Sequence, residues 1–297
     1  MAKLHFVDRK TKSEIADALG LSRFKVARLI DRAIEGGIVQ FVIEEPSDIN
    51  LALSEALRVK YGLKAAFVVE GPDRSSAQVT QPLGAVAAQF LEERLEDGMT
   101  LGVSWGQTIA ATARAVSDLP KVDVVQVAGS PAGADISENP VELVHSFTKA
   151  SGGTGYPVYG PMWADDPALI ERLRHEQGIA RAFDKCAQLD ALIVGIGAWA
   201  SGDSGLARGF PEDWKSRVMA AGAMADICAT LLDASGREVE SPLRDHGLCI
   251  QSEQLRRIPE VIGVAGGLEK VEAIRAVLQG GWIHTLITDG GAARRLT

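Results

Sequence analysis

The sequence contains few cysteines and no long hydrophobic run. Its three cysteines in 297 residues lie far apart and form no Cys-x-x-Cys pair, a pattern that indicates neither a disulfide framework nor a zinc site. We expect Cys186, Cys228 and Cys249 to be reduced and buried. No stretch approaches the roughly 18–20 consecutive apolar residues of a membrane helix, and no signal peptide is recognisable. These absences predict a cytoplasmic protein with neither a metal nor another cofactor.

Positive charge is scarce in the chain as a whole but not at its start. The 31 Lys and Arg residues against 39 Asp and Glu residues give a net charge of −8, which by itself argues against nucleic-acid binding. Residues 1–43 nevertheless hold eight basic and five acidic side chains, so this segment carries +3 and the remainder carries −11. The asymmetry predicts two globular parts with different partners.

Residues 11–37 predict two short helices joined by a tight turn. Thr11 and Glu14 have the spacing of a capping box, and Gly20 is suited to end the first helix. Ser22 is placed to cap the second helix. Apolar residues recur in that helix at spacings of three and four, at Val26, Leu29, Ile30 and Ala33.

This pattern is typical of a helix-turn-helix, whose second helix enters the major groove of DNA. The candidate DNA-contacting residues are Thr11, Lys12, Ser22, Arg23, Phe24, Lys25 and Arg28. Residues 38–43 predict a strand, as in winged variants. Residues 1–8 are short for the first helix of such a module, which favours a natural start upstream of Met1. An ordinary helical hairpin with a solvated basic face is the alternative.

The sequence predicts two domains: a DNA-binding domain over residues 1–46 and an α/β domain over residues 47–297. Short apolar runs typical of buried parallel strands occur at residues 65–69, 100–103, 122–127, 191–196, 261–264 and 285–287. Helical patterns occur at residues 48–61, 82–95, 107–116, 140–150, 167–189 with a break at Gly178, and 268–278. This alternation predicts a doubly wound, mostly parallel sheet. Residues 227–232 and 237–239 predict an inserted β-hairpin.

Glycine-rich turns after the predicted strands are the candidate ligand sites, because open α/β sheets bind ligands at the carboxyl ends of their strands. These turns offer hydroxyl groups, free backbone N–H groups, an acidic residue and a lysine. The candidate ligand-binding residues are Ser104, Trp105, Gly106, Gln107, Thr108, Gly129, Ser130, Gly197, Asp226 and Lys270. Plain loops and a solvated lysine are the alternatives at these positions.

The segment Gly102-Val103-Ser104-Trp105-Gly106 also satisfies the Gly-x-Ser-x-Gly pattern of a hydrolase nucleophile elbow. Such an enzyme needs an acid and a histidine downstream of the serine. The histidines are His145, His175, His246 and His284, and the candidate acids are Asp226 and Asp245. None of them stands in a diagnostic context, so a serine hydrolase is an alternative function.

The sequence resembles the SorC family of bacterial sugar-responsive transcriptional regulators. The resemblance rests on residues 14–16, 19–22, 26–29, 36–39, 102–108, 195–197, 262–274, 280–281 and 286–289. It implies an effector domain similar to phosphosugar isomerases and glucosamine-phosphate deaminases, and a homo-oligomer, dimer or tetramer, on operator DNA. It also implies a sugar, sugar alcohol or phosphate ester as effector, held by Ser104, Gln107, Thr108, Asp226 and Lys270.

Two departures from related sequences bear on catalysis. The deaminases carry Asp-Gly-His after the Gly-Ile-Gly turn, whereas this chain continues with Ala198-Trp199 and has no acid or base there. The residues before Asp226 also differ from the usual small residue and glycine. We therefore predict a non-enzymatic, DNA-binding transcriptional regulator with a carbohydrate effector and no membrane partner. A sugar-phosphate isomerase-like enzyme is a further alternative.

Overall fold

The computed structural model describes residues 1–6, 8–39, 49–131 and 138–297, and the chain divides into two compact units, Met1–Pro46 and Ser47–Thr297. The predicted boundary at residues 46–48 lies outside the described residues, as does most of the predicted strand over residues 38–43. No helix in the described ranges is long and apolar enough to cross a membrane.

The described part of the N-terminal unit consists of α1 (Ala2–Phe6), α2 (Lys12–Leu19) and α3 (Arg23–Glu35). The capping box that starts α2 is confirmed, because the Glu14 N–H donates to the Thr11 hydroxyl at 3.2 Å and the Thr11 N–H donates to Glu14 Oε2 at 2.8 Å. Gly20 ends α2 with φ +62°. The Ser22 hydroxyl then accepts from the Lys25 N–H at 3.2 Å and caps α3.

The core of this unit joins α2 to α3. Ile15, Ala16, Val26 and Ile30 are buried against one another. Leu19, in the last turn of α2, is 46% exposed and lies outside this core. The two described residues of the predicted strand, 38 and 39, form a bend that follows the end of α3.

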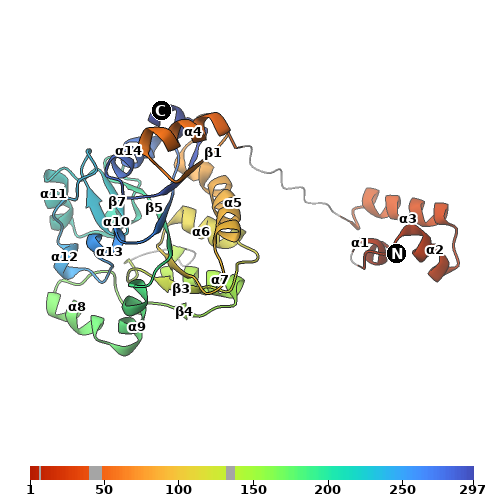
Figure 1. Ribbon diagram of the computed structural model, residues 1–297, viewed down its shortest axis with the longest axis horizontal. Helices are drawn as coiled ribbons and strands as arrows, with labels where there is room; N and C mark the ends of the chain where they lie inside the picture. The colour runs from red at the N-terminus through yellow and green to blue at the C-terminus, as the bar shows by residue number, and fades with distance from the viewer. Residues whose placement is uncertain (7, 40–48, 132–137) are drawn as a thin grey trace. The chain divides into compact units, whose positions relative to one another are not determined.

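A parallel sheet forms the centre of the C-terminal unit (Figure 1). Its strands in the described chain lie in the order β1-β10-β9-β5-β2-β3-β4. Their bounds are β1 (Ala65–Val69), β2 (Thr100–Val103), β3 (Asp123–Gln126), β4 (Gly155–Tyr156), β5 (Ala191–Gly195), β9 (Glu260–Val264) and β10 (Thr285–Asp289). The chain winds outward from β2 to β4 and then returns to place β5 beside β2, so the direction of winding reverses between β2 and β5. The predicted doubly wound architecture is confirmed.

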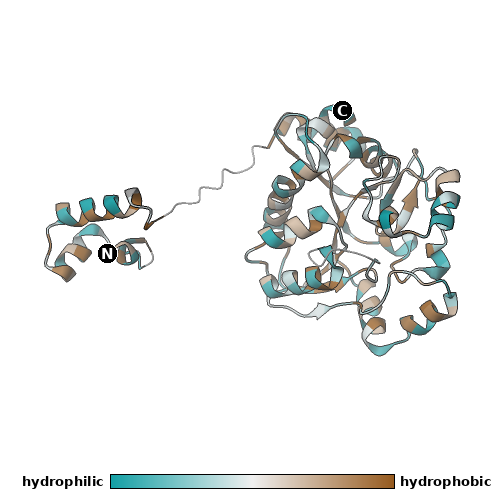
Figure 2. Cartoon of the chain, turned by 180° about the vertical axis from the view of Figure 1, so that it is seen from behind, coloured by the Kyte–Doolittle hydropathy of each residue, from teal (hydrophilic) through white to brown (hydrophobic). Residues whose placement is uncertain are grey.

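Helices cover both faces of this sheet. One face packs against α5 (Ser76–Arg94), α6 (Gln107–Ala115) and α7 (Pro140–Ser151), and the other against α4 (Leu51–Tyr61), α9 (Gln177–Cys186), α14 (Val271–Gln279) and α15 (Gly290–Leu296). Successive residues of a strand point to opposite faces of the sheet: Leu192 and Val194 pack on one face and Ile193 packs on the other. Figure 2 shows these helices alternating between apolar and polar residues, as expected when one side of a helix is buried.

A small antiparallel sheet adjoins the parallel one. It contains β6 (Gly197–Ala198), β7 (Ala225–Ile227) and β8 (Thr230–Leu232). The prediction of a single strand over residues 227–232 was wrong, because Cys228 and Ala229 adopt φ values of +46° and +65° and turn the chain between β7 and β8. The second predicted strand, residues 237–239, is reduced to one bridge with β8.

Two predicted helices start or break elsewhere. α5 begins at Ser76 rather than residue 82, because Ser75 and Gln78 form a capping box. The pattern over residues 167–189 breaks before Gly178, because the Glu176 carboxylate accepts from two N–H groups and starts α9. The other helices of the described chain are α8 (Pro167–Arg174), α10 (Gly205–Gly209), α11 (Glu212–Ala220), α12 (Leu243–His246), α13 (Ser252–Leu255) and the 3-10 helix η2 (Leu268–Lys270).

Candidate functional site

A cavity opens at the carboxyl ends of the central strands of the parallel sheet. It is lined by residues that follow β2, β5 and β9 and by the first turns of α5 and α6. This is the place where the winding reverses between β2 and β5, and ligands bind at such points in open α/β sheets. The cavity holds about 630 Å³ of empty space, part of which is open to solvent.

The fold brings eight of the ten predicted ligand-binding residues to this cavity. They are Ser104, Trp105, Gly106, Gln107, Thr108, Gly197, Asp226 and Lys270. Gly129 and Ser130 are not among its lining residues, and their N–H groups donate to backbone carbonyls of other segments at 2.7 and 2.9 Å. The rest of that turn, residues 132–137, lies outside the described residues. Glu138, which follows it, does line the cavity.

The turn between β2 and α6 presents backbone donors to the cavity. Gly106 precedes α6 with φ +112°, a conformation that residues with a side chain rarely adopt. The N–H groups of Gln107 and Thr108 have no acceptor within the described chain, as expected in the first turn of a helix. The Thr108 hydroxyl donates to the Val264 carbonyl at 2.9 Å. The free N–H groups and the helix dipole favour an anion or a hydroxyl oxygen at this wall.

Asp226 is a buried carboxylate in the lining of the same cavity. Its Oδ1 accepts from Trp199 Nε1–H at 2.7 Å and from the Ser204 hydroxyl at 2.5 Å, while its Oδ2 has no partner among the described residues. Burial raises the pKa of the Asp226 carboxyl, against the opposing effects of the Ser204 and Trp199 hydrogen bonds and the charge of Lys270. A Cβ at Gly197, the β6 residue paired with Asp226, would overlap Oδ1. The carboxylate is therefore held in one position, with Oδ2 available to a hydroxyl donor.

Lys270 and Asp203 form a second polar pair in the cavity. The Lys270 side chain is 17% exposed, and its Nζ donates to the Ile196 carbonyl at 2.8 Å and lies 3.6 Å from Asp203 Oδ2. That carboxylate oxygen is buried without a hydrogen-bond partner in the described chain. Because an ammonium group has three donors, Lys270 retains capacity for a ligand. The pair suits a molecule that carries both a hydroxyl donor and an electron-rich oxygen.

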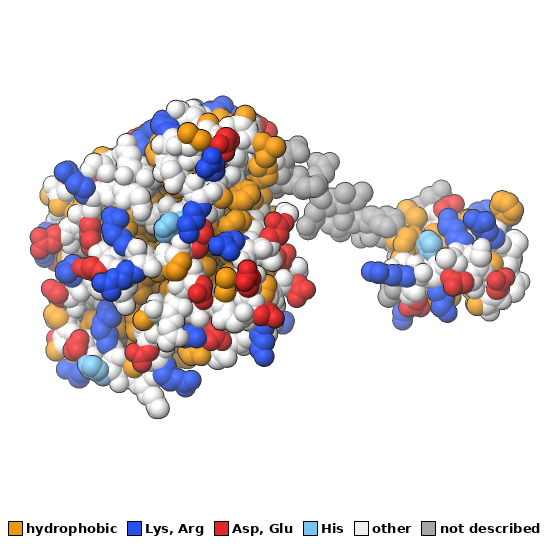
Figure 3. Space-filling view, viewed as in Figure 1, with side chains coloured by type: hydrophobic (Ala, Val, Ile, Leu, Met, Phe, Trp, Pro, Cys, Tyr) orange, Lys and Arg blue, Asp and Glu red, His pale blue; other side chains and the backbone are white. Residues whose placement is uncertain are grey.

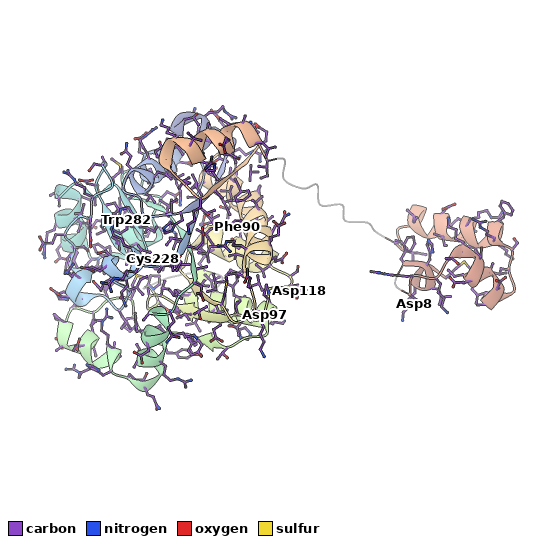
Figure 4. The ribbon with its side chains drawn as sticks, viewed as in Figure 1. Asp8, Phe90, Asp97, Asp118, Cys228 and Trp282 are labelled. Atoms are coloured by element: carbon purple, nitrogen blue, oxygen red, sulfur yellow. The ribbon has the colours of Figure 1, made fainter. Side chains whose placement is uncertain are left out.

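Sequence reasoning missed several lining residues. The polar ones are Ser76, Thr80, Glu138, Asp203, Arg208 and Cys228. Asp203 directly precedes Ser204, and Arg208 lies in α10, which Ser204 caps: the Ser204 hydroxyl accepts from the Ala207 N–H at 3.1 Å. A helix-capping serine was therefore the available signal. Burial raises the pKa of the Cys228 thiol well above its usual value, which keeps it protonated; Figure 4 shows Cys228 inside the C-terminal unit.

Ser104 makes no hydrogen bond from its hydroxyl to a general base in the described chain. Its side chain is buried, and its hydroxyl accepts a long hydrogen bond from the Gly195 N–H at 3.4 Å. No histidine lines the cavity in the described part of the chain. A serine nucleophile requires a base within hydrogen-bond reach, so the cavity geometry does not support the hydrolase alternative.

The start of α3 carries the candidate DNA contacts of the N-terminal unit. Its first two turns expose Arg23, Phe24, Lys25 and Arg28. Thr11 and Ser22 use their side chains in the helix caps, and Lys12 is half-buried at the start of α2. Figure 3 shows Lys and Arg side chains on the visible face of this unit.

Comparisons with known proteins cover the whole chain. A family model described as "Putative sugar-binding domain" matches residues 46–297. The deoxyribonucleoside regulator of Bacillus subtilis is 30% identical over 99% of this chain and 95% of its own length, and the sorbitol operon regulator of Klebsiella pneumoniae is 28% identical over 100% and 96%. The crystal structure of full-length SorC from Klebsiella pneumoniae aligns with a TM-score of 0.77 at 26% identity, covering 99% of this chain and 96% of that one.

Proposed function

The chain belongs to the SorC family of transcriptional regulators with a sugar-binding domain, and we propose that a small carbohydrate in the cavity of its C-terminal unit controls its affinity for operator DNA. Its named relatives are regulators and not enzymes. The observation that carries the proposal is the set of groups with unused hydrogen-bonding capacity in one cavity: the first N–H groups of α6, Lys270, Asp226 Oδ2 and Asp203 Oδ2.

The chemistry of these groups describes the effector. Asp226 Oδ2 and Asp203 Oδ2 accept hydrogen bonds, so they suit the hydroxyl groups of a sugar or a polyol. The first N–H groups of α6 and the Lys270 ammonium donate, so they suit a phosphate or a hydroxyl oxygen. We therefore propose a sugar, a sugar alcohol or one of their phosphate esters, bound by Ser104, Trp105, Gly106, Gln107, Thr108, Gly197, Asp226 and Lys270.

We propose that the effector acts by population shift in a homo-oligomer. A ligand that binds one arrangement of the effector domains more tightly stabilises that arrangement, by no more than the difference between its two affinities. Arrangements that place two helix-turn-helix units at different separations differ in operator affinity, because half-sites lie at fixed spacings on DNA. The protein would act in the cytoplasm, where operator DNA is found.

The proposal is tested by fluorescence anisotropy on DNA from upstream of the protein's own gene. Binding is measured at fixed salt with and without a panel of sugars, polyols and their phosphates. We expect specific binding that one compound strengthens or abolishes. Specific binding that no compound changes would contradict control by a carbohydrate.

Lys25→Ala is expected to lower the affinity for DNA by a similar factor whatever the DNA sequence. The Lys25 side chain is exposed at the start of α3 and has no ion-pair partner within the described residues, so it is available to a phosphate. Loss of one phosphate contact should flatten the slope of log affinity against log salt by about one unit. Lys149→Ala, at an exposed lysine of α7, is the matched control and should leave the slope unchanged. An unchanged slope in Lys25→Ala would place the DNA surface elsewhere.

A further inference from the structure

Phe24 is the most exposed large apolar side chain in the described chain, at 87% of its surface. Single exposed apolar residues are common on proteins, so exposure alone carries no conclusion. The position of Phe24 is more informative, because it is the second residue of α3 and stands between Arg23 and Lys25. An aromatic ring with a cation on each side is suited to a partner that offers both negative charge and apolar surface.

The periodicity of α3 directs Phe24 away from the core. Val26 and Ile30 are buried, and Ala33 lies on the same side of the helix. At about 100° per residue, Phe24 and Arg28 lie on the opposite side, one turn apart. Both side chains are exposed in the described N-terminal unit, and together they form a ridge on the outer side of α3.

The first turn of α3 is held in place by its cap. The Ser22 hydroxyl accepts from the Lys25 N–H at 3.2 Å, which fixes where the helix begins and therefore where the Phe24 ring projects. Arg23, Lys25 and Arg28 make no ion pair within the described residues. Their charges are therefore available to phosphates on either side of a groove.

We propose that Phe24 packs against the 5-methyl group of a thymine in the operator, an inference that rests on the proposed DNA-binding function. In a helix-turn-helix the first residues of the second helix contact base edges in the major groove. The base edges there present hydrogen-bonding groups, and the only apolar group among them is the thymine methyl. A phenyl ring has no conventional hydrogen-bond donor or acceptor, so that methyl is the base feature that suits it best.

The test replaces single thymines by deoxyuridine, which removes only the methyl group. Wild-type protein and Phe24→Ala are titrated by fluorescence anisotropy against the operator, the DNA segment upstream of the gene that the protein binds specifically. Each thymine of the operator is replaced by deoxyuridine in turn. We expect one position per half-site where wild type loses about four-fold in affinity, as expected for one buried methyl group. Phe24→Ala should bind thymine and deoxyuridine equally at that position.

Ile34→Ala is the matched control, because Ile34 is also a partly exposed apolar residue of α3 but lies in its last turn. This variant should discriminate thymine from deoxyuridine as wild type does. Two results would overturn the role of Phe24 and leave the regulator function standing. One is specific binding in which no thymine position is sensitive to deoxyuridine. The other is a loss of affinity on deoxyuridine substitution that is the same in Phe24→Ala as in wild type. Absence of any sequence-specific binding would overturn both.

Discussion

Replacing Lys270 with methionine is expected to lower the affinity for the effector by about 10- to 100-fold, since a hydrogen bond to a charged group contributes about 1.5–3 kcal/mol. Lys270 Nζ sits between the Ile196 carbonyl and Asp203 Oδ2 at the cavity wall. Methionine is unbranched and only one atom shorter than lysine, and it removes the charge and all three donors. Operator binding without effector should be unchanged, because the substitution removes a contact to the effector and none of the candidate DNA contacts.

Isothermal titration with the compound that the panel identifies measures this loss. Lys185→Met is the matched control: its side chain is 21% exposed and its Nζ pairs with Asp123 at 2.9 Å, outside the cavity. That variant should bind the effector as wild type does. An effector affinity within about two-fold of wild type in Lys270→Met would show that Lys270 does not contact the ligand.

Gly197→Ala is expected to disrupt the cavity wall and to abolish effector binding. The new Cβ would overlap Asp226 Oδ1 and lie 2.8 Å from the Ser204 hydroxyl, in a strand pair with no free space. Overpacking costs about 1–3 kcal/mol, and leaving a buried donor or acceptor unpaired costs about the same again. We expect the C-terminal unit to lose about 2–6 kcal/mol of unfolding free energy, measured by urea denaturation.

Gly195→Ala is the matched control for this substitution, because it lies in the same turn. Its Cβ would meet the Trp105 carbonyl at 3.4 Å and the Thr108 hydroxyl at 3.6 Å, which are ordinary contacts. This variant should unfold at a urea concentration close to that of wild type. Wild-type stability and effector affinity in Gly197→Ala would show that the position of Asp226 is not essential to the site.

Local signals in the sequence predict much of this fold. The helix starts at Thr11 and Ser22 depend on side chains within three residues, so the capping pattern is sufficient to find them. The buried strands read as short apolar runs because helices cover both faces of the sheet. The turn at Cys228 and Ala229 carries no such signal, since neither residue favours a positive φ.

The cavity is only partly predictable, because its walls come from distant segments. Ser104 and Lys270 follow glycine-rich turns and are recognisable in the sequence, and the rule for open α/β sheets places them at the same edge. Asp203 stands in a segment with no periodic pattern. It forms a bridge with Ala198 of β6, and Lys270 binds the carbonyl of Ile196 just before that strand. Which strands are neighbours is set by non-local pairing, which local sequence patterns do not encode.

The measurement that tests effector control most directly is the thermodynamic coupling between the two ligands. Operator affinity is measured with and without saturating effector, and effector affinity with and without saturating operator. Because coupling is reciprocal, we expect both affinities to change by the same factor, of about 5-fold or more. A factor of one in both titrations, with each ligand bound specifically, would contradict control of DNA binding by the cavity.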